Sequence, residues 1–150
     1  SLYSKQRVIT TSKFNRGNAG EFLLRFDAGG DNDIDEASEN NRFLAPCPGK
    51  LKSVTIRTKN AMGDTTARLW RAPTGALIKG GNGRDFETEP GAGELDNSSL
   101  TGLAAQTAYK FIFTDDASFE FGDILGISID PTNDPDDGNV TAVWEFDFTD

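Results

Sequence analysis

The feature that most constrains the fold of this chain is an alternation of side chains with a period of two in residues 42–71. Residues 51–58 and 65–71 each place apolar side chains at every second position, which is the spacing of a β-strand. Turn-forming residues separate the two runs, so the sequence predicts a β-hairpin, preceded by a short strand at 42–45 that ends at Pro46. The predicted faces carry Val54, Ile56 and Thr58 on the first strand, and Ala67 and Leu69 opposite Arg68 and Trp70 on the second.

Further strand patterns occur along the rest of the chain. Three aromatic side chains share one face in residues 107–114, three branched apolar side chains do so in 125–129, and residues 140–148 alternate apolar and polar positions. Shorter strands are predicted at 8–9, 21–26 and 76–79. Because no long helical periodicity interrupts these runs, the chain is predicted to be all-β, a two-sheet antiparallel β-sandwich (jelly-roll-like) with a polar N-terminal arm.

The loops between these strands are the expected places for binding contacts. Residues 80–102 contain several glycines among scattered charges and are predicted to form a long surface connection. They lack the terminal Gly-Lys-Ser/Thr that a phosphate-binding loop needs. Residues 131–139 form a second polar turn cluster.

Charge divides the chain into two predicted parts. With 150 residues, the chain is expected to form one folded domain, and its net charge of −9 argues against nucleic acid and anionic membranes as partners. Residues 1–20 contain four basic and no acidic side chains, so the other 130 residues carry −13. We therefore predict a basic N-terminal arm at 1–20 and a β-sandwich domain at 21–150. The candidate partner-binding residues are Lys5, Arg7, Lys13 and Arg16, and the alternative is an arm that is laid along its own acidic domain or is simply mobile.

Enzymatic chemistry is restricted by the residue types present. The chain has no histidine, so histidine-dependent nucleophilic, acid/base and metal chemistry is excluded and only carboxylate chemistry remains. The single cysteine, Cys47, lies between two prolines and is predicted to be a packed small residue. We predict that the protein is not an enzyme and holds no cofactor.

Two acidic clusters are candidate metal sites. Asp31, Asp33 and Asp35 follow the D-x-D-x-D spacing that opens a calcium loop. However, Glu36 stands where an EF-hand needs glycine, and Arg42 stands where it needs a bidentate glutamate. The second cluster contains Asp134 and Asp136. For both clusters the alternative is a solvated acidic loop.

Targeting and assembly are also predicted. No run approaches the length of a transmembrane helix, and the first twenty residues lack the apolar run of a signal peptide, so we expect neither anchoring nor secretion from this stretch. A sandwich has exposed sheet edges, and a basic arm given to a neighbour covers one of them. We predict a homo-oligomer, a trimer.

Three motifs carry a resemblance to a known group of proteins: FLAPxxGxL at 43–51, GDTTxxL at 63–69 and FGDxLxIxIDP at 121–131. Residues 42–148 resemble small β-sandwich virion proteins of tailed bacteriophages, both capsid decoration (cement) proteins and the heads of tail fibres. The resemblance implies a structural protein on the outer capsid surface of the virion, assembled in the host cytoplasm, with the major capsid protein as partner. The alternative that it implies is a tail-fibre, receptor-binding or carbohydrate-binding module in which exposed aromatics (Trp70, Tyr109) engage a glycan.

Overall fold

The computed structural model describes residues 5–26, 42–76, 92–114 and 117–148, and within these ranges the chain forms strands and no helix. All strand pairs are antiparallel, so the predicted all-β class is confirmed. None of the described segments is a helix that could cross a membrane. The strands are β1 (Lys5–Asn15), β2 (Phe22–Leu23), β3 (Phe43–Leu44), β4 (Gly49–Thr58), β5 (Gly63–Ala72), β6 (Gly93–Leu103), β7 (Tyr109–Ile112), β8 (Ile124–Pro131) and β9 (Asp137–Asp147).

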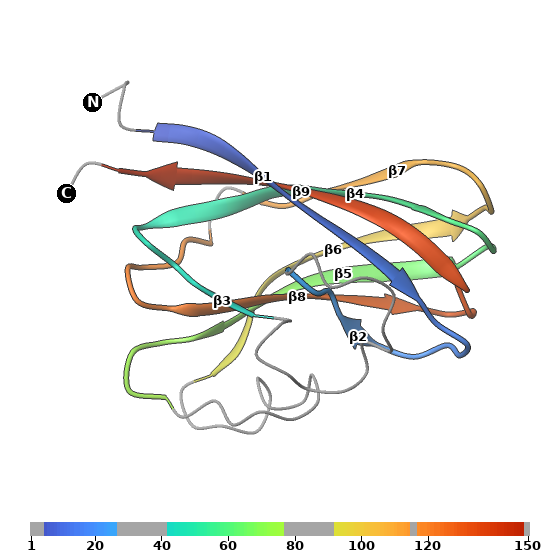
Figure 1. Cartoon of the computed structure of the whole chain (residues 1–150), viewed down its shortest axis with the longest axis horizontal. Helices are drawn as coiled ribbons and strands as arrows, with labels where there is room; N and C mark the ends of the chain where they lie inside the picture. The colour runs from blue at the N-terminus through green and yellow to red at the C-terminus, as the bar shows by residue number, and fades with distance from the viewer. Residues whose placement is uncertain (1–4, 27–41, 77–91, 115–116, 149–150) are drawn as a thin grey trace.

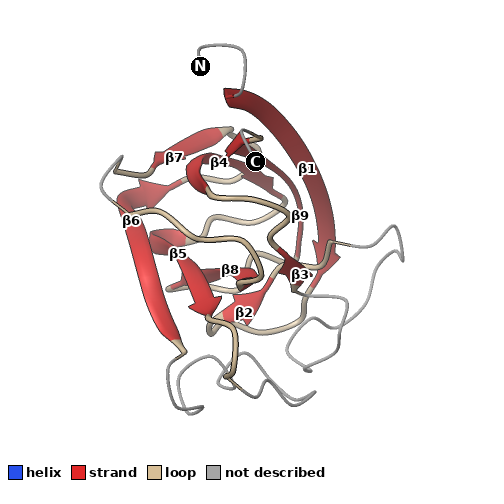
Figure 2. Ribbon diagram, turned by 90° about the vertical axis from the view of Figure 1, so that its left-hand side faces the viewer, coloured by secondary structure: helices blue, strands red, loops and turns tan. Residues whose placement is uncertain are grey.

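These strands form two sheets that pack face to face, which confirms the predicted β-sandwich (Figures 1 and 2). Sheet A has the order β1-β9-β4-β7, and sheet B has the order β2-β8-β5-β6, with β3 also paired to β8. The chain crosses between the sheets at six of the eight connections between consecutive strands, and β1 lies beside β9 at the two ends of the described sequence. This interleaved order is that of a jelly roll.

The central strands β4 and β5 do not form the predicted hairpin, because they lie in different sheets. The turn between them, residues 59–62, crosses from one sheet to the other instead of closing a ladder. Met62 in this turn is buried, and its carbonyl accepts hydrogen bonds from the N–H groups of Thr132 and Asn133 at 3.1 and 3.0 Å. Contacts with the loop before β9 therefore hold the turn in place.

The core lies between the two sheets and is built from the faces that the period-two patterns predicted. Most positions predicted on the apolar faces are buried, and the polar Thr58 is buried with them, but Tyr109 is half-buried and Phe148 is exposed. Trp144 is at the centre of an aromatic group, with its indole Nε1–H donating to Thr10 Oγ1 at 2.8 Å. Inward residues that confirm the predicted faces are Val54, Ile56, Ala67, Leu69, Phe111, Phe113, Leu125, Ile127, Ile129, Val140, Ala142, Trp144 and Phe146.

Three expected elements differ from the structure. The predicted surface connection at 80–102 is wrong for residues 93–102, because they belong to β6, whose ladder with β5 runs nearly its full length. Residues 80–91 lie outside the described part of the chain, as do 77–79 of the strand predicted at 76–79. The strand predicted at 21–26 is reduced to β2, although the Leu24 N–H still donates to the Ile127 carbonyl at 2.8 Å.

Much of the predicted N-terminal arm is a regular strand of sheet A. The strand expected at 8–9 extends over the eleven residues of β1, all paired in register with β9, from Lys5 opposite Asp147 to Asn15 opposite Asp137. Of the two alternatives for this segment, the structure shows the one in which it lies along its own domain. The division into units at 1–20 and 21–150 stays a prediction.

Candidate docking face on sheet A

The outer surface of sheet A is formed by alternate residues of four strands, whose register places them in cross-strand rows. The inward side chains of β1 are identified by buried Phe14 and by Thr10, which binds the buried indole of Trp144. The odd-numbered side chains of β1 therefore point outward. The same rule, applied to β9 and β7 and to β4 on either side of its bulge at Leu51–Ser53, completes the surface. We call it the docking face: Lys5, Arg7, Ile9, Thr11, Lys13 and Asn15 of β1; Asp137, Asn139, Thr141, Val143, Glu145 and Asp147 of β9; Lys50, Ser53, Thr55 and Arg57 of β4; and Lys110 and Ile112 of β7.

The docking face is basic although the chain is acidic. Six of its side chains are basic and three are acidic, which gives a formal charge of +3 on a chain of −9. Two of the acidic residues lie across from basic ones, Glu145 between Arg7 and Lys50, and Asp147 opposite Lys5. The basic residues farther along the face, Lys13, Arg57 and Lys110, are all exposed.

A cross-strand row that ends in two exposed isoleucines crosses the middle of this basic face. Ile9 of β1 lies opposite Val143 of β9, which lies opposite Ser53 of β4, which lies opposite Ile112 of β7. The two isoleucines at the ends of the row are 63% and 62% exposed. Between them, Val143 is half-buried and the polar Ser53 is buried. Two exposed isoleucines flanked by cations are suited to contact with another surface, since the apolar side chains exclude water and the charges orient the partner.

The four residues predicted to bind a partner separate into two groups. Lys5, Arg7 and Lys13 share the outward side of β1 and belong to the docking face. Arg16 does not, because it is buried, with 4% of its surface exposed. Its guanidinium lies 4.3 Å from the ring centre of Phe22, and Nη2 donates to Asn18 Oδ1 at 2.5 Å. Arg16 therefore packs the end of β1, and its burial does not fit the docking contact predicted for it.

Three basic residues of the face were not predicted from the sequence: Lys50, Arg57 and Lys110. They lie 37 or more positions beyond Lys13 in the chain, and only the pairing of β4 with β9 and β7 brings them beside β1. The sequence did contain one signal for them: each alternates with the apolar residues of its own strand, which indicates that its side chain points away from the core. That alternation identifies an outward side but does not identify which sheet the strand joins.

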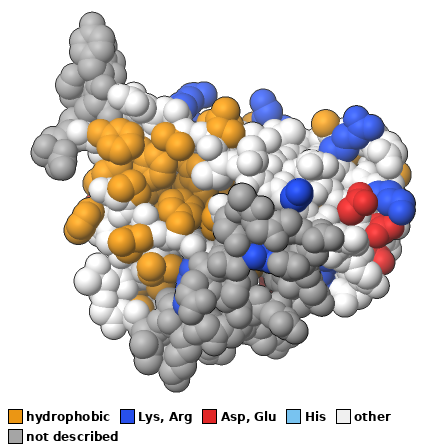
Figure 3. All heavy atoms as spheres, viewed as in Figure 1, with side chains coloured by type: hydrophobic (Ala, Val, Ile, Leu, Met, Phe, Trp, Pro, Cys, Tyr) orange, Lys and Arg blue, Asp and Glu red, His pale blue; other side chains and the backbone are white. Residues whose placement is uncertain are grey.

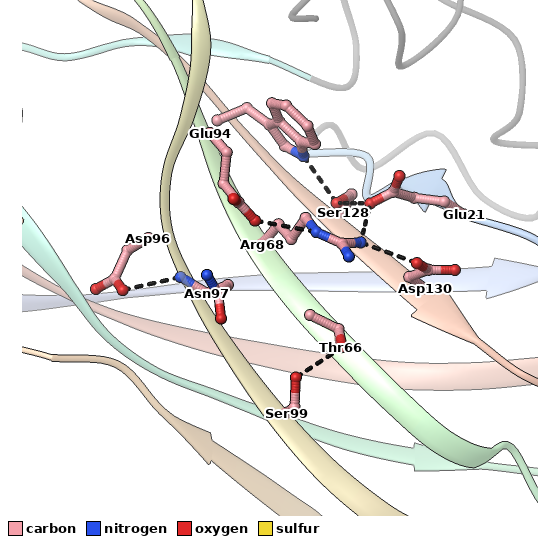
Figure 4. A network of polar contacts seen from close by, with 10 residues as sticks. Glu21, Thr66, Arg68, Glu94, Asp96, Asn97, Ser99, Ser128 and Asp130 are labelled. Atoms are coloured by element: carbon pink, nitrogen blue, oxygen red, sulfur yellow. Dashed lines mark hydrogen bonds and ion pairs between the residues drawn. The ribbon is translucent and has the colours of Figure 1, made fainter.

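A cluster of charged side chains on the outer surface of sheet B has the opposite net charge. Arg68 of β5 forms ion pairs with three carboxylates, from Glu21 (2.7 Å), Glu94 (3.0 Å) and Asp130 (2.9 Å), as Figure 4 shows. Burial lowers the pKa of Arg68, but hydrogen bonds to Asp130 and Glu21 and their charges raise it overall, so the guanidinium stays charged. With one cation and three anions, the cluster carries a formal charge of −2.

The aromatic residues named for glycan contact are not both available. Trp70, predicted to be exposed, is 7% exposed, so that prediction is wrong. Its ring packs with Leu23 and Ala72, and its Nε1–H donates to Ser128 Oγ at 2.8 Å. Tyr109 is half-buried, and its hydroxyl accepts from the Ala104 N–H at 2.9 Å.

The metal candidates that the structure describes are engaged in local contacts. Asp134 Oδ1 accepts from the Asp136 N–H at 2.8 Å, and Asp136 Oδ2 pairs with Lys59 Nζ at 2.9 Å. The hydrogen bond and charge of Asp136, and then the charge of Asp137, raise the pKa of Lys59. Within the described ranges, no three of the Asp, Glu and Cys side chains are grouped to hold a metal ion. Asp31, Asp33 and Asp35 lie outside these ranges.

Cys47 is confirmed as a packed small residue. Its side chain is buried with the main core at 5% exposure, between the outward-facing prolines of the turn before β4. A buried thiol in apolar surroundings is chemically inert compared with an exposed thiolate.

Comparison with known proteins gives structural neighbours only. No protein-family model and no curated protein sequence matches the chain. Solved structures similar to it include one of Bacillus endospore appendages, a family of disulfide-linked pili (9% identity over 97% of this chain and 90% of that one, TM-score 0.42). Others are murine APRIL at pH 5.0 (8%, 92% and 98%, 0.44) and the capsid of the Helicobacter pylori bacteriophage KHP30 (14%, 95% and 92%, 0.40). Similarities at this level do not bear on what the chain does.

Proposed function

We propose that this protein is a non-enzymatic docking protein that binds an acidic partner surface through the docking face of sheet A. The observation that carries the proposal is the charge of that face, which is +3 on a chain of −9. Cations arranged on a rigid sheet attract an acidic surface without the entropic cost of ordering a flexible arm.

The opposite charges of the docking face and the Arg68 cluster also fix the orientation of docking. Sheet A presents the cations, while the Arg68 cluster on sheet B carries −2 and is repelled by the same acidic partner. The protein therefore lands with sheet A inward and sheet B toward solvent. Wrong orientations are disfavoured because they place like charges together.

The specific assignment is a capsid decoration protein whose partner is the outer surface of the major capsid protein. The support is the resemblance of residues 42–148 to small virion sandwiches together with the docking face. Many weak contacts repeated over a lattice give strong total binding, so a modest face on each copy is sufficient.

The first experiment tests the assignment to the virion. Intact phage particles that encode this protein are purified, and its copies per particle are counted by quantitative mass spectrometry against the major capsid protein. Hundreds of copies are expected. A handful of copies, or recovery only with tails, assigns the protein to a tail fibre and rejects the decoration role.

The second experiment tests the face itself by rebinding purified protein to capsids that lack it. Lys110→Gln is the informative variant, because Lys110 lies on the docking face but far from residues 1–20 in the chain. The matched control is Lys59→Gln, an exposed lysine of the turn between β4 and β5 that pairs with Asp136. Lys110→Gln is expected to weaken binding severalfold and to make binding less dependent on salt. Each charge contact contributes both to the affinity and to the dependence of the affinity on salt.

Equal binding by the Lys110→Gln and Lys59→Gln proteins would reject the sheet face as the docking site. Loss of binding only in Lys5→Gln, Arg7→Gln or Lys13→Gln would restrict the contact to β1.

A further inference from the structure

A second surface is apolar, lies at one end of the sandwich and adjoins one end of the docking face. Figure 3 shows hydrophobic side chains gathered where β1 begins and β9 ends. We call this surface the apolar end. Its exposed members are Val8 (36%), Leu44 (60%), Phe121 (71%) and Phe148 (44%), and Phe26 and Phe43 are half-buried beside them.

The apolar end is continuous with the aromatic core. The ring of Phe43 lies 4.9 Å from that of Phe26 and 5.0 Å from that of Trp144, and the ring of Phe146 lies 5.8 Å from that of Phe148. Trp144 and Phe146 stack at 6.3 Å and join the two groups. Such a surface is held in shape by buried neighbours, which lowers the cost of ordering it on binding.

Leu44 and Phe121 belong to the same end through the backbone. The turn that carries Phe121 is tied to β3 by a hydrogen bond from the Gly122 N–H to the Ala45 carbonyl at 3.0 Å, and by another from the Ala45 N–H to the Asp123 carbonyl at 2.8 Å. Asp123 Oδ2 accepts from the Glu120 N–H at 2.8 Å and closes the turn. Phe121, the most exposed large apolar side chain in the described ranges, is therefore displayed by a fixed turn.

The apolar end meets the docking face at a surface pocket whose charges balance. The pocket is lined by Lys5 and Lys50 and by Glu145 and Asp147, two cations and two anions that also belong to the docking face. At this pocket the net charge favours neither a strongly acidic nor a strongly basic partner. A second copy of this chain brings the same pocket, so that in a two-fold contact the lysines of one copy face the carboxylates of the other.

We infer that the apolar end is the surface through which copies of this chain associate. The contact buries Leu44, Phe121 and Phe148, and the mixed charges around them pair across the interface. It leaves most of the docking face free, including Lys13, Arg57 and Lys110, and so goes beyond the proposed function without depending on it.

The experiment measures the mass of the full chain in solution by light scattering and sedimentation at micromolar concentration. The protein is expected to have at least twice its chain mass of 16.2 kDa, and the mass also shows whether the predicted trimer is correct. The triple variant Leu44→Ser, Phe121→Ser, Phe148→Ser is expected to raise the dissociation constant by about tenfold or more, because exposed apolar anchors dominate such contacts.

The matched control is Ile112→Ser, which removes an equally exposed apolar side chain, 62% against 60% for Leu44, from the docking face. It is expected to keep the oligomer intact. The urea midpoints of both variants establish that they fold. A monomeric wild-type protein, or equal masses for the triple variant and the wild type, would overturn the inference.

The salt dependence of self-association and that of docking have opposite signs, so they test this inference and the proposed function separately. Each copy carries −9, and this repulsion outweighs the few exposed ion pairs at the rim of the contact, because exposed ion pairs contribute little to binding. Raising the salt from about 0.05 to 0.5 M therefore strengthens association through the apolar end. The same change weakens docking of the basic face on an acidic surface. Self-association that falls with salt would place the contact between the docking face of one copy and the acidic surface of the next, and would reject the apolar end.

Discussion

At the scale of single residues, Gly49 at the start of β4 lies where its neighbours leave no room for a side chain. A Cβ added there would lie 2.3 Å from the Glu145 carbonyl oxygen and 2.8 Å from Cζ of Phe119. Both neighbours are fixed, since Phe119 is fully buried and exchanges backbone hydrogen bonds with Gly49. We expect Gly49→Ala to lower the free energy of unfolding by about 1 to 3 kcal/mol, measured by urea denaturation, because β4 and β9 must move apart.

Gly17→Ala is the control for this measurement, because a Cβ at Gly17 would meet no atom within 4 Å. Its free energy of unfolding is expected to stay within about 0.5 kcal/mol of the wild type. If the two alanine variants unfold at the same urea concentration, the close approach of β4, β9 and residue 119 is not as described.

At the scale of elements, β1 determines whether residues 1–18 can be treated as a removable arm. Deleting them removes the ladder on β9 and the acceptor of the Trp144 indole, and it also removes Phe14, whose ring lies 4.8 Å from that of Phe22. The loss of a buried phenylalanine alone costs about 3 to 5 kcal/mol. We expect the truncated chain to unfold at markedly lower urea or to aggregate through the exposed edge of β9.

The combined Lys5→Gln, Arg7→Gln, Lys13→Gln variant distinguishes the contribution of the β1 charges to docking from the contribution of the β1 backbone to stability. It keeps the ladder and changes only outward side chains, so its urea midpoint is expected to match the wild type while its docking weakens. A truncated chain as stable as the full one would show that β1 does not support sheet A.

The same elements show how far the sequence predicts this fold. Period-two patterns identified β4, β8 and β9 and their buried faces, because burial on one side of a strand is visible in the order of its own residues. They did not show that β4 pairs with β9 rather than with β5, since that choice depends on Met62 and its contacts with residues 132–133, far away in the chain. β6 was missed for a related reason: its outward residues are small and polar, and only Leu95, Leu100 and Leu103 face the core. The docking face was accordingly predicted only for the part that β1 contributes.

At the scale of the whole molecule, the docking face and the apolar end have complementary roles. The face supplies weak charge contacts, and the apolar end joins copies so that several faces meet the same acidic lattice at once. Linked sites raise total binding by about 10² to 10⁴-fold without any new contact. The Leu44→Ser, Phe121→Ser, Phe148→Ser protein keeps its docking face, but it is expected to rebind capsids much more weakly than the wild type, as measured by cosedimentation at equal chain concentration.

The converse variant completes the argument for two surfaces with different roles. Lys110→Gln weakens each docking contact but leaves the apolar end unchanged, so its mass in solution is expected to equal that of the wild type while its capsid binding falls. Together the two variants separate avidity from contact strength, because one changes the number of joined copies and the other changes the charge on each. If the triple serine variant is monomeric yet binds capsids as tightly as the wild type, single copies are sufficient for docking. Self-association would then have no part in holding the protein on the lattice.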